Sequence, residues 1–176
     1  MNWAEIKKND IANGEGVRTS LFVSGCRHHC KNCFNKITWD FNYGKPYTHQ
    51  TQQEILDSID HYWINGLSLL GGEPFEPENQ QEIIGLLKEF HQRFPEKNVW
   101  CYSGFTIEEI TGKSTPQSRA FTEHSIEMLK LIDILVDGPF IEEKKNIMLK
   151  FRGSENQRVI DIKKTVKNGE IVLYLD

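Results

Sequence analysis

The chain has 176 residues and a net charge of −4, with 38% hydrophobic and 26% charged residues, which is typical of a globular protein. It has no long basic block, which argues against a nucleic-acid binder, and no apolar run long enough to span a bilayer. The N-terminus MNWAEIKKND lacks the apolar core of a signal peptide, so we expect a cytoplasmic protein without a membrane or nucleic-acid partner.

Short apolar runs and helical spacing predict alternating elements along the chain. Strands are expected at residues 18–24, 67–70, 99–102 and 134–136. Helices are expected from Thr51, over 78–94, from Thr106 and over 122–131. Thr51 with Glu54, and Thr106 with Glu109, match the spacing of a capping box. Near the end, the extended runs 159–166 and 170–175 flank Asn168-Gly169, a dipeptide that favours a hairpin turn.

This alternation favours a parallel sheet with helices packed outside it. A complete eight-unit barrel takes about 250 residues, so a chain of 176 residues would hold only part of one. We therefore expect a single domain over residues 1–176, with an α/β fold that forms a partial (β/α) barrel and ends in a C-terminal β-hairpin.

Unusual residues follow each predicted strand. The cysteine-rich stretch 26–33 follows the first, Gly71-Gly72-Glu73-Pro74 the second, Ser103 the third and Asp137 the fourth. The carboxyl ends of parallel strands meet at one edge of the sheet, where sites are usually found. We expect these four loops to converge on one pocket.

The cysteines point to a metal cofactor. Three of them fall within eight positions with the spacing C-x3-C-x2-C: Cys26, Cys30 and Cys33. Iron–sulfur cubanes are normally held by four thiolates, so three would leave one iron open to a small molecule. A structural zinc that adds His28 or His29 is the alternative, although four ligands in eight residues would be cramped. Cys101 lies in an apolar run and is expected to be a small buried hydrophobe.

The stretch Gly71-Gly72-Glu73-Pro74 suits the binding of a small ligand. Gly71 and Gly72 have no Cβ atom, so their backbone can approach a ligand closely. Pro74 keeps Glu73 extended, and the Glu73 carboxylate suits an ammonium group. Alone this stretch is more often a turn, but together with the cysteines it indicates a site.

The cysteine spacing followed by Gly-Gly-Glu-Pro resembles the radical S-adenosylmethionine (SAM) superfamily. The resemblance implies a fold of the radical SAM type, with Cys26, Cys30 and Cys33 as ligands and catalytic residues of a [4Fe-4S] cluster, and SAM on the open iron. It also implies which residues contact SAM. Asn32, Cys33 and Phe34 would lie at the adenosyl side, Gly71, Gly72 and Glu73 at the methionine amino group, and Ser103 and Asp137 would make further polar contacts.

Longer stretches resemble the family of activating proteins of anaerobic ribonucleoside-triphosphate reductases. They are DIANGEGVRTSLFVSGC, CFNKITWDF, LSLLGGEPF, VDGPFIEEKKN and FRGSENQR, and they cover about residues 10–162. This resemblance implies that SAM is cleaved to methionine and a 5′-deoxyadenosyl radical, which makes a glycyl radical in the large reductase subunit. Reduced flavodoxin is the electron donor it implies. Asn32 stands where the family often has glycine, and asparagine tolerates the positive φ that glycine adopts.

Other readings stay open at this point. The chain could activate another glycyl radical enzyme, such as pyruvate formate-lyase, or act on a pterin-derived ring. It could instead be a non-catalytic iron–sulfur or zinc module, which would explain the cysteines but not the Gly-Gly-Glu-Pro stretch. Residues 10–19 and 140–152 are candidates for contact with the reductase. A homodimer and a complex with the reductase are both compatible with the sequence.

Overall fold

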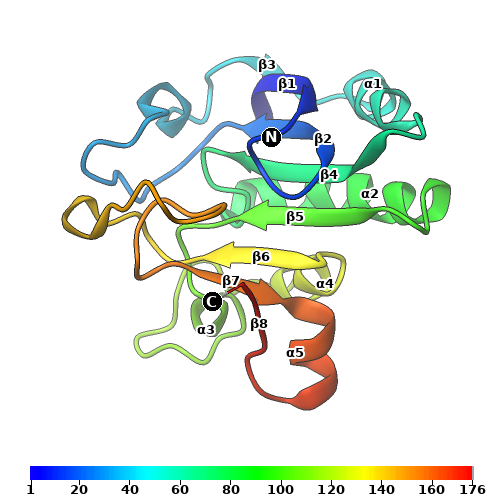
Figure 1. Ribbon diagram of the computed structural model, residues 1–176. Coiled ribbons are helices and arrows are strands. Elements are labelled where there is room, and N and C mark those ends of the chain that lie inside the picture. Colours follow the sequence, from blue (N-terminus) through cyan, green and yellow to red (C-terminus); the bar gives the residue numbers. More distant parts are fainter. Residues whose placement is uncertain (176) are drawn as a thin grey trace.

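The computed structural model describes residues 1–175, which form an eight-stranded mixed sheet in the order β3-β1-β2-β4-β5-β6-β7-β8 (Figure 1). The strands are β1 Asn2–Asp10, β2 Val17–Val23, β3 Lys45–Pro46, β4 Ile64–Gly71, β5 Asn98–Tyr102, β6 Ile134–Asp137, β7 Arg158–Asp161 and β8 Leu173–Leu175. The same residues contain five α-helices: α1 His49–Ile59, α2 Pro77–Arg93, α3 Ile107–Ile110, α4 Ser125–Lys130 and α5 Ile162–Asn168. Short 3-10 helices cover Lys36–Trp39 and Glu142–Lys144.

The sheet is open, so the predicted partial barrel of the radical SAM type is wrong. β2, β4, β5 and β6 are parallel, as the alternation of strands and helices predicted. Antiparallel strands flank this parallel centre on both sides: β1 and β3 on one side, β7 and β8 on the other. A barrel closes only when its first and last strands pair, and here β3 and β8 lie at opposite edges of the sheet.

The predicted C-terminal hairpin is also wrong. β7 and β8 do pair in antiparallel fashion, but α5 connects them instead of a two-residue turn. Asp161 caps the start of α5 by accepting a hydrogen bond from Lys164 N at 2.9 Å. Gly169 ends the helix in the left-handed conformation with φ 75°. The Asn-Gly dipeptide therefore marks the end of a helix. Glycine adopts a positive φ easily, and this conformation is needed at helix ends as well as in hairpin turns.

Side-chain caps fix where the other helices begin. α1 is capped by Thr48, whose hydroxyl accepts from Thr51 N at 3.2 Å, so the helix starts earlier than predicted and Thr51 is not its cap. The capping box at Thr106 and Glu109 is confirmed, because both of its hydrogen bonds are present. α4 begins only at Ser125, three residues after the predicted start.

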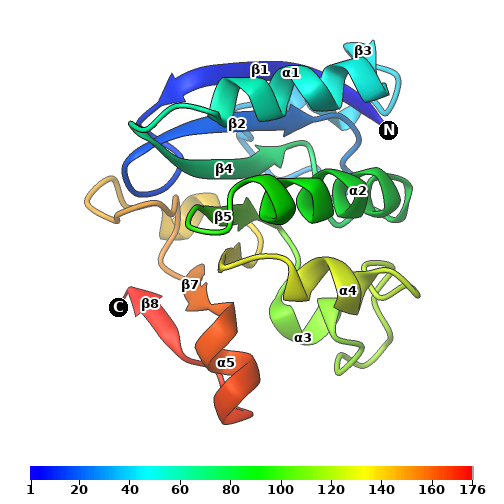
Figure 2. The ribbon, with the colours of Figure 1, turned by 90° about the vertical axis from the view of Figure 1, so that its right-hand side faces the viewer.

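The two faces of the sheet are covered differently. Helices α1, α2 and α4 pack on one face, where alternate strand residues such as Leu67, Leu69 and Cys101 are fully buried (Figure 2). Cys101 is therefore the small buried hydrophobe that its apolar surroundings predicted. The opposite face carries a smaller cluster built on Trp100 and Val136, which Phe151 and Tyr174 cover. No helix within residues 1–175 is both long and apolar enough to cross a membrane.

The parallel centre brings its carboxyl ends to one side of the molecule. In Figure 1 the arrowheads of β4, β5 and β6 point toward the side where residues 24–35 and 138–157 lie. We call residues 24–35 the cysteine loop and residues 138–157 the rim segment. Both loops follow strands of the parallel centre. Parallel pairing alone therefore brings these strand-end loops to the same side, and no closed barrel is needed.

Candidate functional site

A cavity of about 540 Å³ opens between the cysteine loop, the end of β4 and the rim segment. Most of the predicted site residues line it: Cys26, Cys30, Asn32, Cys33, Phe34, Gly71, Gly72 and Glu73. Its floor includes Leu70 and Tyr102, which alternate with helix-facing residues and so lie on the other face of the sheet. A second hollow of similar volume, between β1 and α1, contains none of the predicted site residues.

The cysteine loop is tied to the fold more firmly at its start than at its end. Gly25 N donates to Thr38 O at 2.8 Å and Cys26 N donates to Trp39 O at 3.2 Å. Cys33 N donates to Cys30 O at 3.1 Å, which closes the tight turn between those two cysteines. Asn32 sits in this turn with φ 57°, a left-handed conformation that asparagine tolerates better than most residues.

The three thiols differ in burial. Cys26 is buried, while Cys30 and Cys33 are half-buried, and all of them are free thiols. Burial, with a smaller contribution from the nearby Glu73 carboxylate, raises the pKa of the Cys26 thiol to about 12. Burial also raises the pKa of Cys30. A metal bound here would therefore have to displace protons, as metals commonly do when they bind thiols.

The geometry of the thiols is compatible with a cluster. Within residues 1–175, no three His, Cys, Asp or Glu side chains gather closely enough to hold a single metal ion. A [4Fe-4S] cluster is a larger group whose thiolates bind different irons. Three cysteines that line one cavity of about 540 Å³ fit such a group.

Gly71 and Gly72 are glycines because another backbone passes close to them. A Cβ on Gly71, where φ is 110°, would lie 2.6 Å from Val23 N. A Cβ on Gly72 would lie 2.6 Å from Gly25 O. Gly72 N donates to Val23 O at 2.7 Å, so the ends of β2 and β4 run side by side into the cavity. The two glycines thus join the cysteine loop to the sheet, in addition to lining the cavity.

The Glu73 carboxylate is turned into the protein. The residue is 1% exposed, and its oxygens accept hydrogen bonds from four groups. Oε1 accepts from Phe75 N at 2.8 Å and Ser103 Oγ at 2.9 Å. Oε2 accepts from Gly104 N at 2.7 Å and His28 Nε2 at 3.0 Å. One carboxylate therefore connects the ends of β4 and β5 to the cysteine loop.

Close packing reinforces the contact between His28 and the end of β5. The His28 ring lies edge-on to Phe105, with ring centroids 4.3 Å apart. A Cβ on Gly104 would come within 2.7 Å of the same ring. His28 is thus a part of the frame around the cavity, and its side chain is largely buried.

Glu76 is a second buried carboxylate beside the cysteine loop, and the sequence pattern did not point to it. It accepts from Arg27 N at 2.8 Å and from the Arg27 guanidinium at 2.6 Å. Arg119 completes the arrangement with an Nε contact of 3.1 Å. Burial raises the pKa of Glu76, but the hydrogen bonds from Arg119 and Arg27 outweigh it and lower the pKa overall. Glu76 precedes Pro77 at the start of α2, where the sequence indicated only a helix start.

Ser103 and Asp137 are the two predicted site residues that the structure does not bring to the cavity wall. The Ser103 hydroxyl donates to Glu73 and accepts from Phe105 N at 3.0 Å. Asp137 is fully buried and pairs with Arg158, whose Nε lies 2.9 Å from Oδ1. Both residues support the ends of their strands from behind the cavity.

Tyr102 lines the cavity one position before Ser103, and the sequence pattern did not single it out. Its hydroxyl oxygen is buried and has no hydrogen-bond partner among residues 1–175. Burial raises the pKa of this hydroxyl, so it stays protonated and can donate. Strand alternation could have found it, because Cys101 faces the helices and its neighbour must face the other way.

Known proteins resemble this chain over most of its length. A family model described as a 4Fe-4S single cluster domain matches residues 12–160. An anaerobic ribonucleoside-triphosphate reductase-activating protein of Enterobacteria phage T4 is 37% identical over 161 residues, which cover 90% of this chain and 93% of that protein. The protein of the same name from Escherichia coli is 35% identical over 161 residues, covering 90% of this chain and 97% of the relative. One from Salmonella typhi is 37% identical over 152 residues, or 85% and 92% of the two chains.

Proposed function

Because the chain belongs to the family of anaerobic ribonucleoside-triphosphate reductase-activating proteins and carries their 4Fe-4S domain, we propose that it generates a glycyl radical in such a reductase by cleaving SAM. The large reductase subunit is then its protein substrate, and a low-potential carrier such as reduced flavodoxin is its electron donor. We propose that it works in the cytoplasm, together with the reductase and the electron carrier.

We assign the cluster to the thiolates of Cys26, Cys30 and Cys33, with one iron left for SAM. When bound there, the cluster would supply the electron for the reductive cleavage of SAM to methionine and a 5′-deoxyadenosyl radical. This radical would take a hydrogen atom from the Cα of the target glycine, which would release 5′-deoxyadenosine and leave the unpaired electron on the reductase. The chain's own residues bind and orient SAM and keep water from the reaction.

The residues of the cavity wall supply those contacts in our proposal. The backbone of Gly71 and Gly72 offers carbonyl oxygens to the methionine ammonium, and Asn32 and Phe34 border the adenosyl side. Tyr102 adds a hydrogen-bond donor, because its hydroxyl is buried without a partner in the described part of the chain. In our proposal Glu73 supports the cavity wall through its four hydrogen bonds, which come from Phe75, Ser103, Gly104 and His28, and does not contact SAM directly.

The observation that carries the proposal is the meeting of three cysteines with Gly71 and Gly72 on one cavity. Cys101 is fully buried in the helix-facing layer, so it does not complete a set of four thiolates on that wall. An electron carrier has no need of an iron without a protein ligand. Three ligands beside a ligand-sized cavity are what a SAM-cleaving cluster needs.

Electron paramagnetic resonance of the anaerobically reconstituted, reduced protein tests the proposal. We expect a reduced [4Fe-4S] signal that shifts when SAM is added, and 5′-deoxyadenosine formation when the reductase is present. Cys30→Ala should abolish both. A cluster signal that does not change when SAM is added would contradict the proposal and would favour a non-catalytic electron-transfer module.

A further inference from the structure

Three large apolar side chains on the two loops around the cavity are almost fully exposed. Phe34 is 85%, Ile147 88% and Met148 84% exposed. Phe34 belongs to the cysteine loop and Ile147 to the rim segment, and both line the cavity. An ion pair of 3.1 Å between Lys31 and Glu143 joins the two loops. Single exposed apolar residues are ordinary, but bulky ones gathered at one cavity mark a recognition surface.

The rim segment holds its apolar side chains outward through its own hydrogen bonds. Gln157 Oε1 accepts from Gly153 N at 2.8 Å, while Gln157 Nε2 donates to Gly138 O at 3.0 Å. Asn146 Oδ1 accepts from Met148 N at 3.0 Å. A loop that is ordered before it binds loses little conformational entropy in a complex, which favours its use in recognition.

The same two loops carry a local excess of positive charge. The cysteine loop contains two Lys and Arg and no Asp or Glu, and the rim segment contains four Lys and Arg and three Glu. Together the two loops carry a net charge of +3, although the whole chain has a net charge of −4. Lys145 and Arg152 line the cavity, and neither forms an ion pair with any residue in the range 1–175. A partner that fits this mouth must combine apolar side chains with carboxylates.

We propose that Phe34, Ile147 and Met148 form the docking surface for the reductase segment that carries the target glycine, with acidic groups of that segment facing Lys145 and Arg152. This rests on the proposed function, which requires the glycine to reach this cavity. A second copy of the chain is a poorer occupant. A symmetric contact would bring the same positively charged loops face to face.

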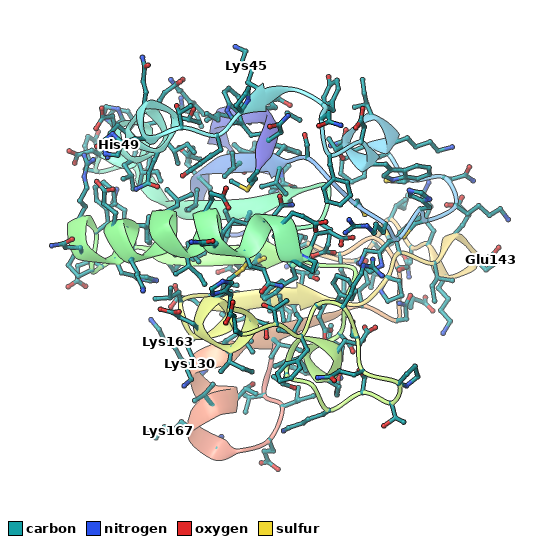
Figure 3. All side chains as sticks on the ribbon, turned by 180° about the vertical axis from the view of Figure 1, so that it is seen from behind. Lys45, His49, Lys130, Glu143, Lys163 and Lys167 are labelled. Carbon is teal, nitrogen blue, oxygen red and sulfur yellow. The ribbon has the colours of Figure 1, made fainter. Side chains whose placement is uncertain are left out.

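Paired variants test the docking surface without touching the cavity wall. Met148→Asp places a charge where an apolar contact is expected, and Lys150→Glu reverses one charge of the rim segment. Tyr62→Asp is the matched control for the first, because Tyr62 is 96% exposed and lies between α1 and β4, outside both loops. Lys167→Glu is the control for the second. Figure 3 shows Lys167 near one end of the molecule and Glu143, which belongs to the rim segment, near the other.

The affinity of each reconstituted variant for the cognate reductase is measured anaerobically by biolayer interferometry. Loss of an apolar anchor at an interface commonly costs about tenfold or more in affinity, so we expect at least that for Met148→Asp. Lys150→Glu should weaken binding by about threefold to tenfold at low salt and less at high salt, because salt screens exposed charges. Both controls should bind as the unmodified chain does.

Cluster content, oligomeric state and SAM cleavage driven by dithionite without the reductase are measured on the same preparations. If the unmodified chain cleaves no SAM even when the reductase is present, the proposed function fails. If it cleaves SAM while Met148→Asp binds the reductase normally, the docking surface is wrong and the chemistry stands. If Met148→Asp changes only the oligomeric state, the surface belongs to a second copy and the proposal is overturned.

Discussion

The burial of Glu73 predicts that its main contribution is to the stability of the frame around the cavity. Glu73→Gln is the sharpest perturbation, because it keeps the shape of the side chain and removes its charge. The amide oxygen can still accept from Phe75 N and Ser103 Oγ. The amide NH₂ group then takes the place of Oε2 and meets Gly104 N–H, a donor that lies 2.7 Å from that oxygen.

The expected cost can be worked from these contacts. Leaving the Gly104 N–H without an acceptor in a buried place costs about 1–3 kcal/mol. The remaining hydrogen bonds lose their charge assistance, which costs about 1 kcal/mol more. We therefore expect the free energy of unfolding to fall by about 2–4 kcal/mol, a large share of the typical 5–15 kcal/mol.

Urea unfolding of the iron-free protein, kept reduced and followed by tryptophan fluorescence, measures this change. With a slope of about 2 kcal/mol per molar urea, the midpoint should fall by about 1–2 M. Glu54→Gln is the control, because Glu54 is half exposed and pairs with Lys8 on the surface. If Glu73 served only to attract the ammonium group of SAM, its neutralisation would leave the midpoint unchanged, and that result would refute the reasoning.

Three further predictions follow from the site and its supports. Gly72→Ala would put a Cβ 2.6 Å from Gly25 O, so the variant should bind little iron on reconstitution; full iron content would contradict the close approach. Burial raises the pKa of Asp10, but hydrogen bonds from Ser20 and Asn13 outweigh it and bring the pKa from 3.8 to about 2. The stability that this carboxylate contributes is therefore present above about pH 4 and lost as the pH falls toward 2. Urea midpoints measured across this range should fall for the unmodified chain, and Asp10→Asn should remove the part of that fall that is due to Asp10. Cys101→Ala should leave the iron content and the paramagnetic resonance signal unchanged, since Cys101 is buried in the helix-facing layer; a lost cluster would show a fourth ligand.

The sequence predicted the elements that have a regular apolar pattern. It failed for elements whose pattern is irregular or compatible with two structures. Apolar runs and apolar periodicity predicted β4, β5, β6 and α2, because each of these elements buries one continuous set of apolar side chains. The sequence did not predict β1, because most of its residues are half-buried or exposed. Its pairing register with β2 also shifts twice, between Trp3 and Glu5 and between Lys7 and Asp10. Those irregularities erase the alternation that identifies a strand. Asn168-Gly169 was ambiguous, because glycine with positive φ serves helix ends as well as hairpins.

The site was predictable at the level of loops but not of side-chain direction. Cysteine spacing and strand-end positions pointed to the right cavity, because topology alone brings the ends of parallel strands together. The direction of Glu73 could not be read from the sequence. It depends on donors from Phe75, Ser103, Gly104 and His28, which come together only in the folded chain.

The supports of the cysteine loop are unequal, and this bears on how the loop meets its cofactor. Two buried carboxylates hold the stretch that follows Cys26: Glu76 accepts from the Arg27 backbone, and Glu73 accepts from the His28 ring. Beyond Cys30 the one backbone hydrogen bond that closes the turn is from Cys33 N to Cys30 O, while Asn32 and Phe34 are exposed. Protein contacts thus fix the first thiol before any metal arrives. The other two depend more on iron to fix their positions, which leaves the half of the loop nearest the cavity mouth free to adjust to SAM and to a docked partner.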